Sequence, residues 1–252
     1  MTDTRSKVAL ITGANKGLGL ESARGLGKLG ATVIIGCRDL AKGEGAVKAL
    51  LADGVADARA FRLEVTSTKD HQRAADYLQS EFGKLDILIN NAGVMLDEID
   101  FGPGGANSTV TVSSKVLRDT FDTNFFDVVA LTQTLLPLIK QSPAGRIVNL
   151  SSILGSLTLH ADKTSDIYNM KGFAYDASKT ALNAFTVHLA HALRDTKIKV
   201  NSAHPGWVKT DMGGPNAPMD LADGGKTSVQ LATLPDDGPT GGFFHMGQPL
   251  PW

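Results

Sequence analysis

The sequence has only one cysteine, Cys37, among 252 residues. A single cysteine excludes a disulfide within the chain and favours a reducing compartment. The formal net charge is -1, so no excess of one sign directs the protein to nucleic acid or to an anionic membrane. We see no signal peptide and no apolar run long enough to span a membrane, and we expect a cytoplasmic protein.

Metal-ligand spacing and repeats are also missing. The six histidines follow no ligand pattern, so we predict no metal site. The length is at the upper end of what one hydrophobic core supports, and 42% hydrophobic residues with 20% charged residues are ordinary for a globular protein. Residues 1–252 are therefore interpreted as a single domain.

Short apolar runs alternate with segments of helical periodicity along the chain. This alternation predicts βα units, and continuous apolar runs are typical of parallel strands covered on both faces. We expect strands at 8–11, 31–37, 58–63, 85–90, 146–150 and 199–203. We expect helices at 18–29, 41–51, 70–82, 113–139 and from near 175 to 196. The predicted fold class is α/β: a doubly wound parallel sheet flanked by helices on both faces.

A glycine-rich turn, from Thr12 to Gly19, lies between the first strand and the first helix. Glycines there let the backbone turn tightly and approach a diphosphate, which binds the free N–H groups at the start of a helix. The spacing Gly-x-x-x-Gly-x-Gly differs from the commonest dinucleotide motif, but its position inside a βαβ unit favours a nucleotide site.

The end of the second strand reads Cys37-Arg38-Asp39. An acid at this point would bind the ribose of NAD, whereas an arginine would suit the 2′-phosphate of NADP. Arg38 comes first after the strand, and Lys16 adds a second cation, so we favour NADP(H). The alternative is a surface Arg–Asp pair without a ligand.

Tyr175 and Lys179 lie four residues apart, on one face of a predicted helix. An ammonium beside a phenol lowers the phenol pKa from about 10, which makes the tyrosine a candidate acid or base. A solvated helix face is the alternative. Tyr168 is followed by a lysine at three residues instead of four and precedes Gly172, so we do not expect it to be the proton donor.

Together with Asn90-Asn91-Ala92-Gly93 and Pro205-Gly206, these motifs occur in an order that resembles the short-chain dehydrogenase/reductase family. The resemblance covers essentially the whole chain and is greatest to the NADPH-dependent carbonyl reductase branch. It implies a Rossmann-type domain, with substrate loops near 95–112, 153–173 and 210–228. It also implies Ser152 as the residue that binds the substrate carbonyl, and Asn124 as the holder of a water in a proton relay.

The resemblance further implies that Lys179 binds the nicotinamide ribose beside Tyr175. The other residues that it implies around the cofactor are Gly13, Asn15, Lys16, Gly17, Leu18, Gly19, Arg38, Leu63, Glu64, Val65, Asn91, Ala92, Gly93, Pro205, Gly206, Val208 and Thr210. Met95, Leu154, Trp207 and Met212 would lie near the nicotinamide and the substrate, although core packing is the better interpretation for any one of them.

The chain departs from the family pattern in two places. Glu64 stands where an aspartate is usual, and it keeps the acid that meets the adenine amino group but with a longer reach. The interval from Ser152 to Tyr175 is longer than in compact members by roughly ten residues, an estimate from spacing alone. We expect the extra stretch, about 157–173, to arch over the mouth of the site, with His160, Met170 and Phe173 as walls.

The sequence thus predicts an NADPH-dependent enzyme that reduces a ketone or aldehyde, with Tyr175 as general acid. The alternatives are an NAD(P)-dependent alcohol dehydrogenase and a non-enzymatic NADP-binding protein. The expected partner is a small carbonyl substrate. The family favours homodimers and homotetramers, and the insertion could block such a contact.

Overall fold

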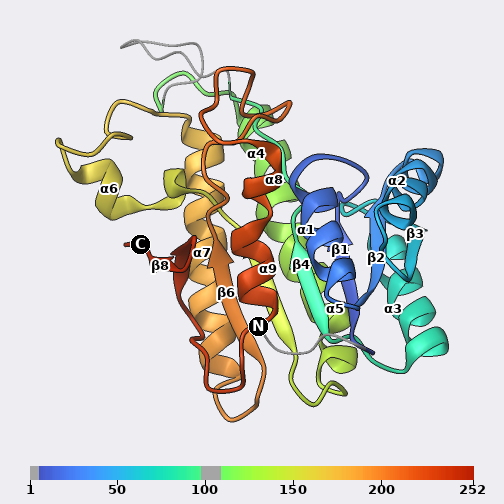
Figure 1. The fold of residues 1–252 in the computed structure, drawn as a ribbon. Helices are drawn as coiled ribbons and strands as arrows, with labels where there is room; N and C mark the ends of the chain where they lie inside the picture. Colours follow the sequence, from blue (N-terminus) through green and yellow to red (C-terminus); the bar gives the residue numbers. More distant parts are fainter. Residues whose placement is uncertain (1–5, 98–108) are drawn as a thin grey trace.

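The computed structural model describes residues 6–97 and 109–252, which form α/β layers around one sheet (Figure 1). The strands are β1 (Val8–Thr12), β2 (Thr32–Cys37), β3 (Ala58–Arg62), β4 (Ile87–Asn90), β5 (Arg146–Leu150), β6 (Lys199–Ala203), β7 (Phe243–His245) and β8 (Gln248–Pro249). The helices are α1 (Gly17–Lys28), α2 (Leu40–Ala52), α3 (Thr68–Phe82), α4 (Ser114–Phe121), α5 (Asp127–Ile139), α6 (Leu157–Ala161), α7 (Phe173–Ala192), α8 (Leu221–Gly224) and α9 (Lys226–Ala232).

The strand order is β3-β2-β1-β4-β5-β6-β7-β8, and every neighbouring pair is parallel except β7 with β8. The order reverses direction between β1 and β4, the point at which such sheets bind ligands beyond the carboxyl ends of their strands. The predicted doubly wound fold is confirmed. The short strands β7 and β8 were not predicted, because two or three residues carry too little periodicity.

The core lies on both faces of the sheet, because successive strand residues point in opposite directions. On one face Ile11, Ile35 and Ile89 pack with α1, α2 and α9. On the other face Leu10, Ile34 and Leu88 pack with α3, α5 and α7. Fully burying each of these side chains contributes about 1.5–3 kcal/mol. The two buried faces explain why the strand sequences are continuously apolar.

A row of buried polar side chains crosses the middle of the sheet. Asn90 of β4 donates to Asn149 of β5 at 2.9 Å and to Thr132 of α5 at 3.0 Å. Asn149 donates to Thr186 of α7 at 2.9 Å, and the Thr186 and Ser202 hydroxyls lie 2.8 Å apart. These hydrogen bonds tie three adjacent strands to two helices just below the edge where the site forms.

The predicted helix at 113–139 is helical throughout, but its middle turn, Asp122–Phe126, is π-helical. A π turn often marks a functional site, and Asn124 lies at its centre. The prediction that the last long helix ends near Thr196 is wrong by one turn, since α7 ends at Ala192. Among the described residues, no helix combines the length and the hydropathy needed to cross a bilayer.

Candidate active site

The predicted site motifs meet at one edge of the sheet, because each follows the carboxyl end of a parallel strand. The glycine turn follows β1, Asn91–Gly93 follows β4, Ser152 follows β5 and Pro205–Gly206 follows β6. A Cβ placed on Gly93 would lie 3.3 Å from Asn124 Oδ1 and 3.5 Å from Lys179 Nζ. The structure therefore brings the β4 motif against the helices that carry Asn124 and Lys179.

Ser152, Tyr175 and Lys179 are all buried and adjacent. The Ser152 hydroxyl lies near enough to the Tyr175 hydroxyl to lower the pKa of the phenol. The Lys179 ammonium lies 5.5 Å from the centroid of the Tyr175 ring and donates to the Leu150 carbonyl at 2.8 Å. This arrangement presents two hydroxyls side by side, with an ammonium behind them.

The pKa of Tyr175 is opposite in direction to the sequence prediction. Burial raises it to about 12, and the neighbouring Ser152 hydroxyl only partly opposes that rise. Burial also lowers the pKa of Lys179 to about 8, since the charged form is disfavoured away from water. Burial therefore sets the direction of the Tyr175 shift, and a phenol with this pKa is neutral at pH 7.

Asn124 is completely buried and holds the loop that follows β4. Its Oδ1 accepts from Val94 N at 2.8 Å, while Nδ2 donates to Val94 O at 2.8 Å and to Ser178 Oγ at 3.0 Å. Both amide hydrogens are thus used by the protein. For the predicted water, the side chain of Asn124 can offer only an acceptor oxygen.

The glycine turn fits a dinucleotide diphosphate. Gly13 and Gly17 have φ values of +64° and +59°, and a Cβ on Gly17 would point into open space. Asp39, Ser67 and Ser113 cap α2, α3 and α4, whereas no side chain caps α1. The first N–H groups of α1 are therefore left for an anion.

Arg38 and Glu64 lie together at the ends of β2 and β3. The Arg38 side chain is 79% exposed and its Nε lies 3.9 Å from the Glu64 carboxylate, too far for a hydrogen bond. Asp39 instead accepts from Lys42 N at 3.2 Å as the N-cap of α2. With Asp39 used as a cap, Arg38 is the charged group beyond β2 that can turn toward a phosphate.

Lys16 does not join Arg38. Its ammonium lies 2.5 Å from the carboxylate of Asp211, and both side chains are exposed. This ion pair links the glycine turn to the loop after β6 across a sequence separation of 195 residues. The predicted pairing of Lys16 with Arg38 around one phosphate would require Lys16 to leave Asp211.

The loop after β6 is closed on itself. Gly206 has a φ of +93°, Val208 is buried and pairs with Met219, and Thr210 Oγ1 accepts from Gly213 N at 3.0 Å. Trp207 and Met212 are exposed, so the interpretation of these two as core residues is wrong. Their exposure leaves them free to contact a ligand.

The model of the short chain dehydrogenase family matches residues 7–220. The chain belongs to this family. It is 33% identical to human carbonyl reductase [NADPH] 1, over 97% of this chain and 98% of that protein. It is 31% identical to salutaridine reductase of Papaver bracteatum, over 98% and 96% of the two chains.

The fold is similarly close to solved short chain dehydrogenase structures. The NADPH-bound carbonyl reductase from chicken fatty liver superposes with a TM-score of 0.82 at 28% identity, covering 98% of this chain and all of that one. Salutaridine reductase from Papaver somniferum superposes with a TM-score of 0.80 at 29% identity, covering 95% and 99% of the chains.

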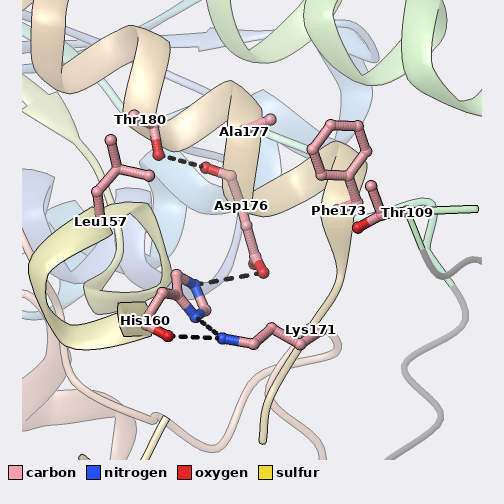
Figure 2. A pocket seen from close by; sticks show the side chains of 8 residues that line it. All are labelled: Thr109, Leu157, His160, Lys171, Phe173, Asp176, Ala177 and Thr180. Carbon is pink, nitrogen blue, oxygen red and sulfur yellow. Dashed lines mark hydrogen bonds and ion pairs between the residues drawn. The ribbon is translucent and has the colours of Figure 1, made fainter. Parts of the chain in front are cut away.

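The predicted insertion, residues 157–173, lies beside α7 (Figure 1). A turn of 3-10 helix at Ile153–Gly155 precedes it, and its first residues form α6. Its residues His160 and Phe173 line a cavity of about 290 Å³ together with Asp176, Ala177 and Thr180 (Figure 2). Phe173, Asp176, Ala177 and Thr180 share a helix face from which Tyr175 and Lys179 do not project.

The prediction that the insertion arches over the mouth of the site, with His160, Met170 and Phe173 as walls, stays a prediction. Of these residues, His160 and Phe173 line the cavity described above. The cavity that they line includes neither Ser152 nor Tyr175. The His160 ring holds the insertion in place through two contacts: its Nε2 lies 2.9 Å from Leu154 O and its Nδ1 lies 2.9 Å from the Lys171 ammonium. Tyr168 lies in a turn outside α7. Of the predicted loop at 95–112, residues 98–108 lie outside the described part of the chain.

Two residues that support the site, Ser178 and His204, were missed, and Asn91, which was predicted beside the cofactor, has a further structural role. Asn91 Nδ2 donates to Thr12 O at 2.7 Å and so fixes the glycine turn. Ser178 donates to Tyr175 O at 2.7 Å. His204 Nδ1 accepts from Ile153 N at 3.2 Å beside Ser152, and burial lowers the pKa of His204 to about 3, which keeps it neutral. None of these roles has a local sequence signal, because each partner is distant in the chain or serves a backbone group.

Proposed function

We propose that this protein is an NADPH-dependent reductase that converts the carbonyl group of a ketone or aldehyde to an alcohol. The observation that carries the proposal is the buried pair of neighbouring hydroxyls of Ser152 and Tyr175, with the Lys179 ammonium beside them. Relatives named as NADPH carbonyl reductases, similar over nearly their whole length, support the same chemistry.

Arg38 and the glycine turn support NADP(H) as the cofactor. The exposed guanidinium would bind the 2′-phosphate, and Gly13, Gly17 and Gly19 would hold the diphosphate on the uncapped start of α1. Asn91–Gly93 and Pro205–Thr210 would line the nicotinamide side, with Leu63 to Val65 near the adenine. The bound cofactor supplies a hydride to the carbonyl carbon.

Ser152 and Tyr175 would bind the carbonyl oxygen with their two hydroxyls. A phenol with its pKa raised to about 12 remains protonated at pH 7, so Tyr175 has a proton to give to the forming alkoxide. Lys179 would stabilise the phenolate that results, and would hold the ribose next to it. Asn124 would support the proton relay through its acceptor oxygen and the π-helical turn around it.

An NADPH-oxidation screen over ketones, aldehydes and quinones of varied size tests this function. We expect turnover by the wild type and none by Tyr175→Phe, while NADPH binding followed by fluorescence titration stays within about threefold. Retained turnover in Tyr175→Phe would show that Tyr175 is not the general acid. Preference of the wild type for NADH, or turnover only of alcohols with NAD, would identify the oxidative enzyme instead.

A further inference from the structure

The first turn of α7, which carries Tyr175, cannot cap itself. Its N-cap is Gly172, which has no side chain to accept from the free N–H groups of the turn. Ala174 and Tyr175 are buried, so water cannot satisfy these groups either. A buried N–H without a partner is costly, and the helix therefore needs an acceptor from elsewhere in the chain.

Asp97 supplies that acceptor from a position 78 residues earlier. Its Oδ2 accepts from Tyr175 N at 2.6 Å and its Oδ1 from Ala174 N at 3.3 Å. Only 7% of the residue is exposed. A carboxylate at the N-terminal end of a helix also interacts favourably with the helix dipole, and hydrogen bonds to a charged acceptor are stronger than neutral ones.

The contacts of Asp97 complete a ring of hydrogen bonds around Tyr175. Asn124 holds Val94 at the other end of the same loop, and also bonds Ser178. Ser178 donates to the carbonyl of Tyr175, while Asp97 accepts from its N–H. The backbone of Tyr175 is thus held on both sides by residues linked through the loop that follows β4.

A second carboxyl shares this helix start without replacing Asp97. Asp176 Oδ2 accepts from Gly172 N at 3.1 Å. Burial first, and then the charge of Asp97, raise the pKa of Asp176 to about 8, so that Asp176 is mostly protonated at pH 7. Of the two, Asp97 makes the direct contacts to Ala174 and Tyr175.

We propose that Asp97 is a positioning residue, which holds the first turn of α7 so that the Tyr175 hydroxyl stays beside Ser152 and beside the loop after β4. The expected effect of Asp97 on turnover rests on the proposed function, whereas its expected effect on the first turn of α7 does not. A displacement of about 1 Å at a reacting group can cost on the order of 100-fold in rate. We therefore expect Asp97→Ala to lower kcat by roughly 10- to 100-fold with little change in KM for NADPH. The kcat of Asp97→Asn, which keeps one acceptor oxygen, should lie between those of Asp97→Ala and the wild type.

Three measurements on the full-length protein test the proposal. The first is kcat and KM at a temperature where circular dichroism shows each variant folded. The second is the solvent deuterium isotope effect on kcat, which should rise when proton transfer from Tyr175 becomes slower. The third is amide hydrogen exchange of the segment with Ala174 and Tyr175. We expect its rate to rise by at least about tenfold in Asp97→Ala, because these two N–H groups lose their hydrogen bonds to Asp97.

Ser113→Ala is the matched control, because Ser113 caps α4 through Val116 N at 3.1 Å and its cap serves a helix other than α7. It should leave the exchange at Tyr175, and the isotope effect, as in the wild type. Unchanged exchange in Asp97→Ala, or a kcat within about twofold of the wild type, would overturn the proposal. If the wild type reduces no carbonyl compound, the proposed function fails, while the exchange measurement still decides the role of Asp97.

Discussion

Gly19→Ala tests whether the glycine turn has the tight packing on which cofactor binding depends. Gly19 lies in the first turn of α1. A Cβ there would stand 2.6 Å from Asn91 Nδ2, 2.8 Å from Ala14 Cα and 2.9 Å from Gly13 O. Non-bonded carbon atoms prefer about 3.5–4.0 Å, so all three contacts are overlaps.

The size of the effect follows from which atoms must move. Two of the three belong to the backbone of the turn itself and cannot rotate away, and the third holds Thr12 O through a hydrogen bond. Overpacking of this kind costs about 1–3 kcal/mol. In a chain of this length each 1 kcal/mol lowers the unfolding midpoint by about 2–4 °C. Because the displaced turn would bind the diphosphate, NADPH affinity should also fall, by roughly 10-fold for each 1.4 kcal/mol of binding free energy that is lost.

Gly45→Ala is the control for this substitution. Gly45 lies within α2, is exposed, and has no atom within 4 Å of an added Cβ. Alanine there should stabilise the protein by about 0.5–1 kcal/mol and leave NADPH binding unchanged. Thermal unfolding and calorimetric titration with NADPH measure both variants. A wild-type dissociation constant in Gly19→Ala would refute the placement of the cofactor on this turn.

Three further substitutions have defined outcomes. Arg38→Asp should change the ratio of kcat/KM for NADPH over NADH in favour of NADH by at least about 100-fold, since a carboxylate repels the 2′-phosphate and accepts from ribose hydroxyls; an unchanged ratio would exclude Arg38 from the site. Asp211→Asn should free Lys16 and tighten NADPH binding severalfold at low salt without tightening NADH binding, as titration of both cofactors would show. Asp176→Asn should flatten the pH dependence of stability. The pKa of this carboxyl is about 8 in the folded protein and 3.8 as its ordinary value, so its contribution to the stability of the wild type is lost as pH rises from about 4 to about 8. Urea unfolding of both proteins at pH 5 and pH 8 measures the difference.

The sequence was sufficient for the parts of the fold that depend on local patterns. The apolar runs predicted β5 and β6 with the bounds that the structure has, and the four-residue spacing predicted that Tyr175 and Lys179 share a helix. The glycine turn was predictable because its backbone requirement is met by one residue type. These features are set within a few residues of chain.

The sequence was insufficient where burial or a partner distant in the chain sets the properties of a residue. The spacing of Tyr175 and Lys179 suggested a lowered phenol pKa, but the sequence does not show that both groups are buried. Lys16 bonds Asp211, and the helix of Tyr175 takes its cap from Asp97; both contacts join segments that no local pattern connects. The side of α7 on which the insertion lies is likewise a matter of tertiary packing.

The polar row through Asn90, Asn149 and Ser202 also bears on how the strands find their alignment during folding. A slip of β5 by one residue would turn Asn149 toward the opposite, apolar face of the sheet. Each buried polar group left without a partner costs about 1–3 kcal/mol, so misaligned sheets would be disfavoured by several such penalties at once. Since Ser152 lies three residues beyond Asn149, correct alignment of the strand interiors also sets the reach of the serine toward Tyr175.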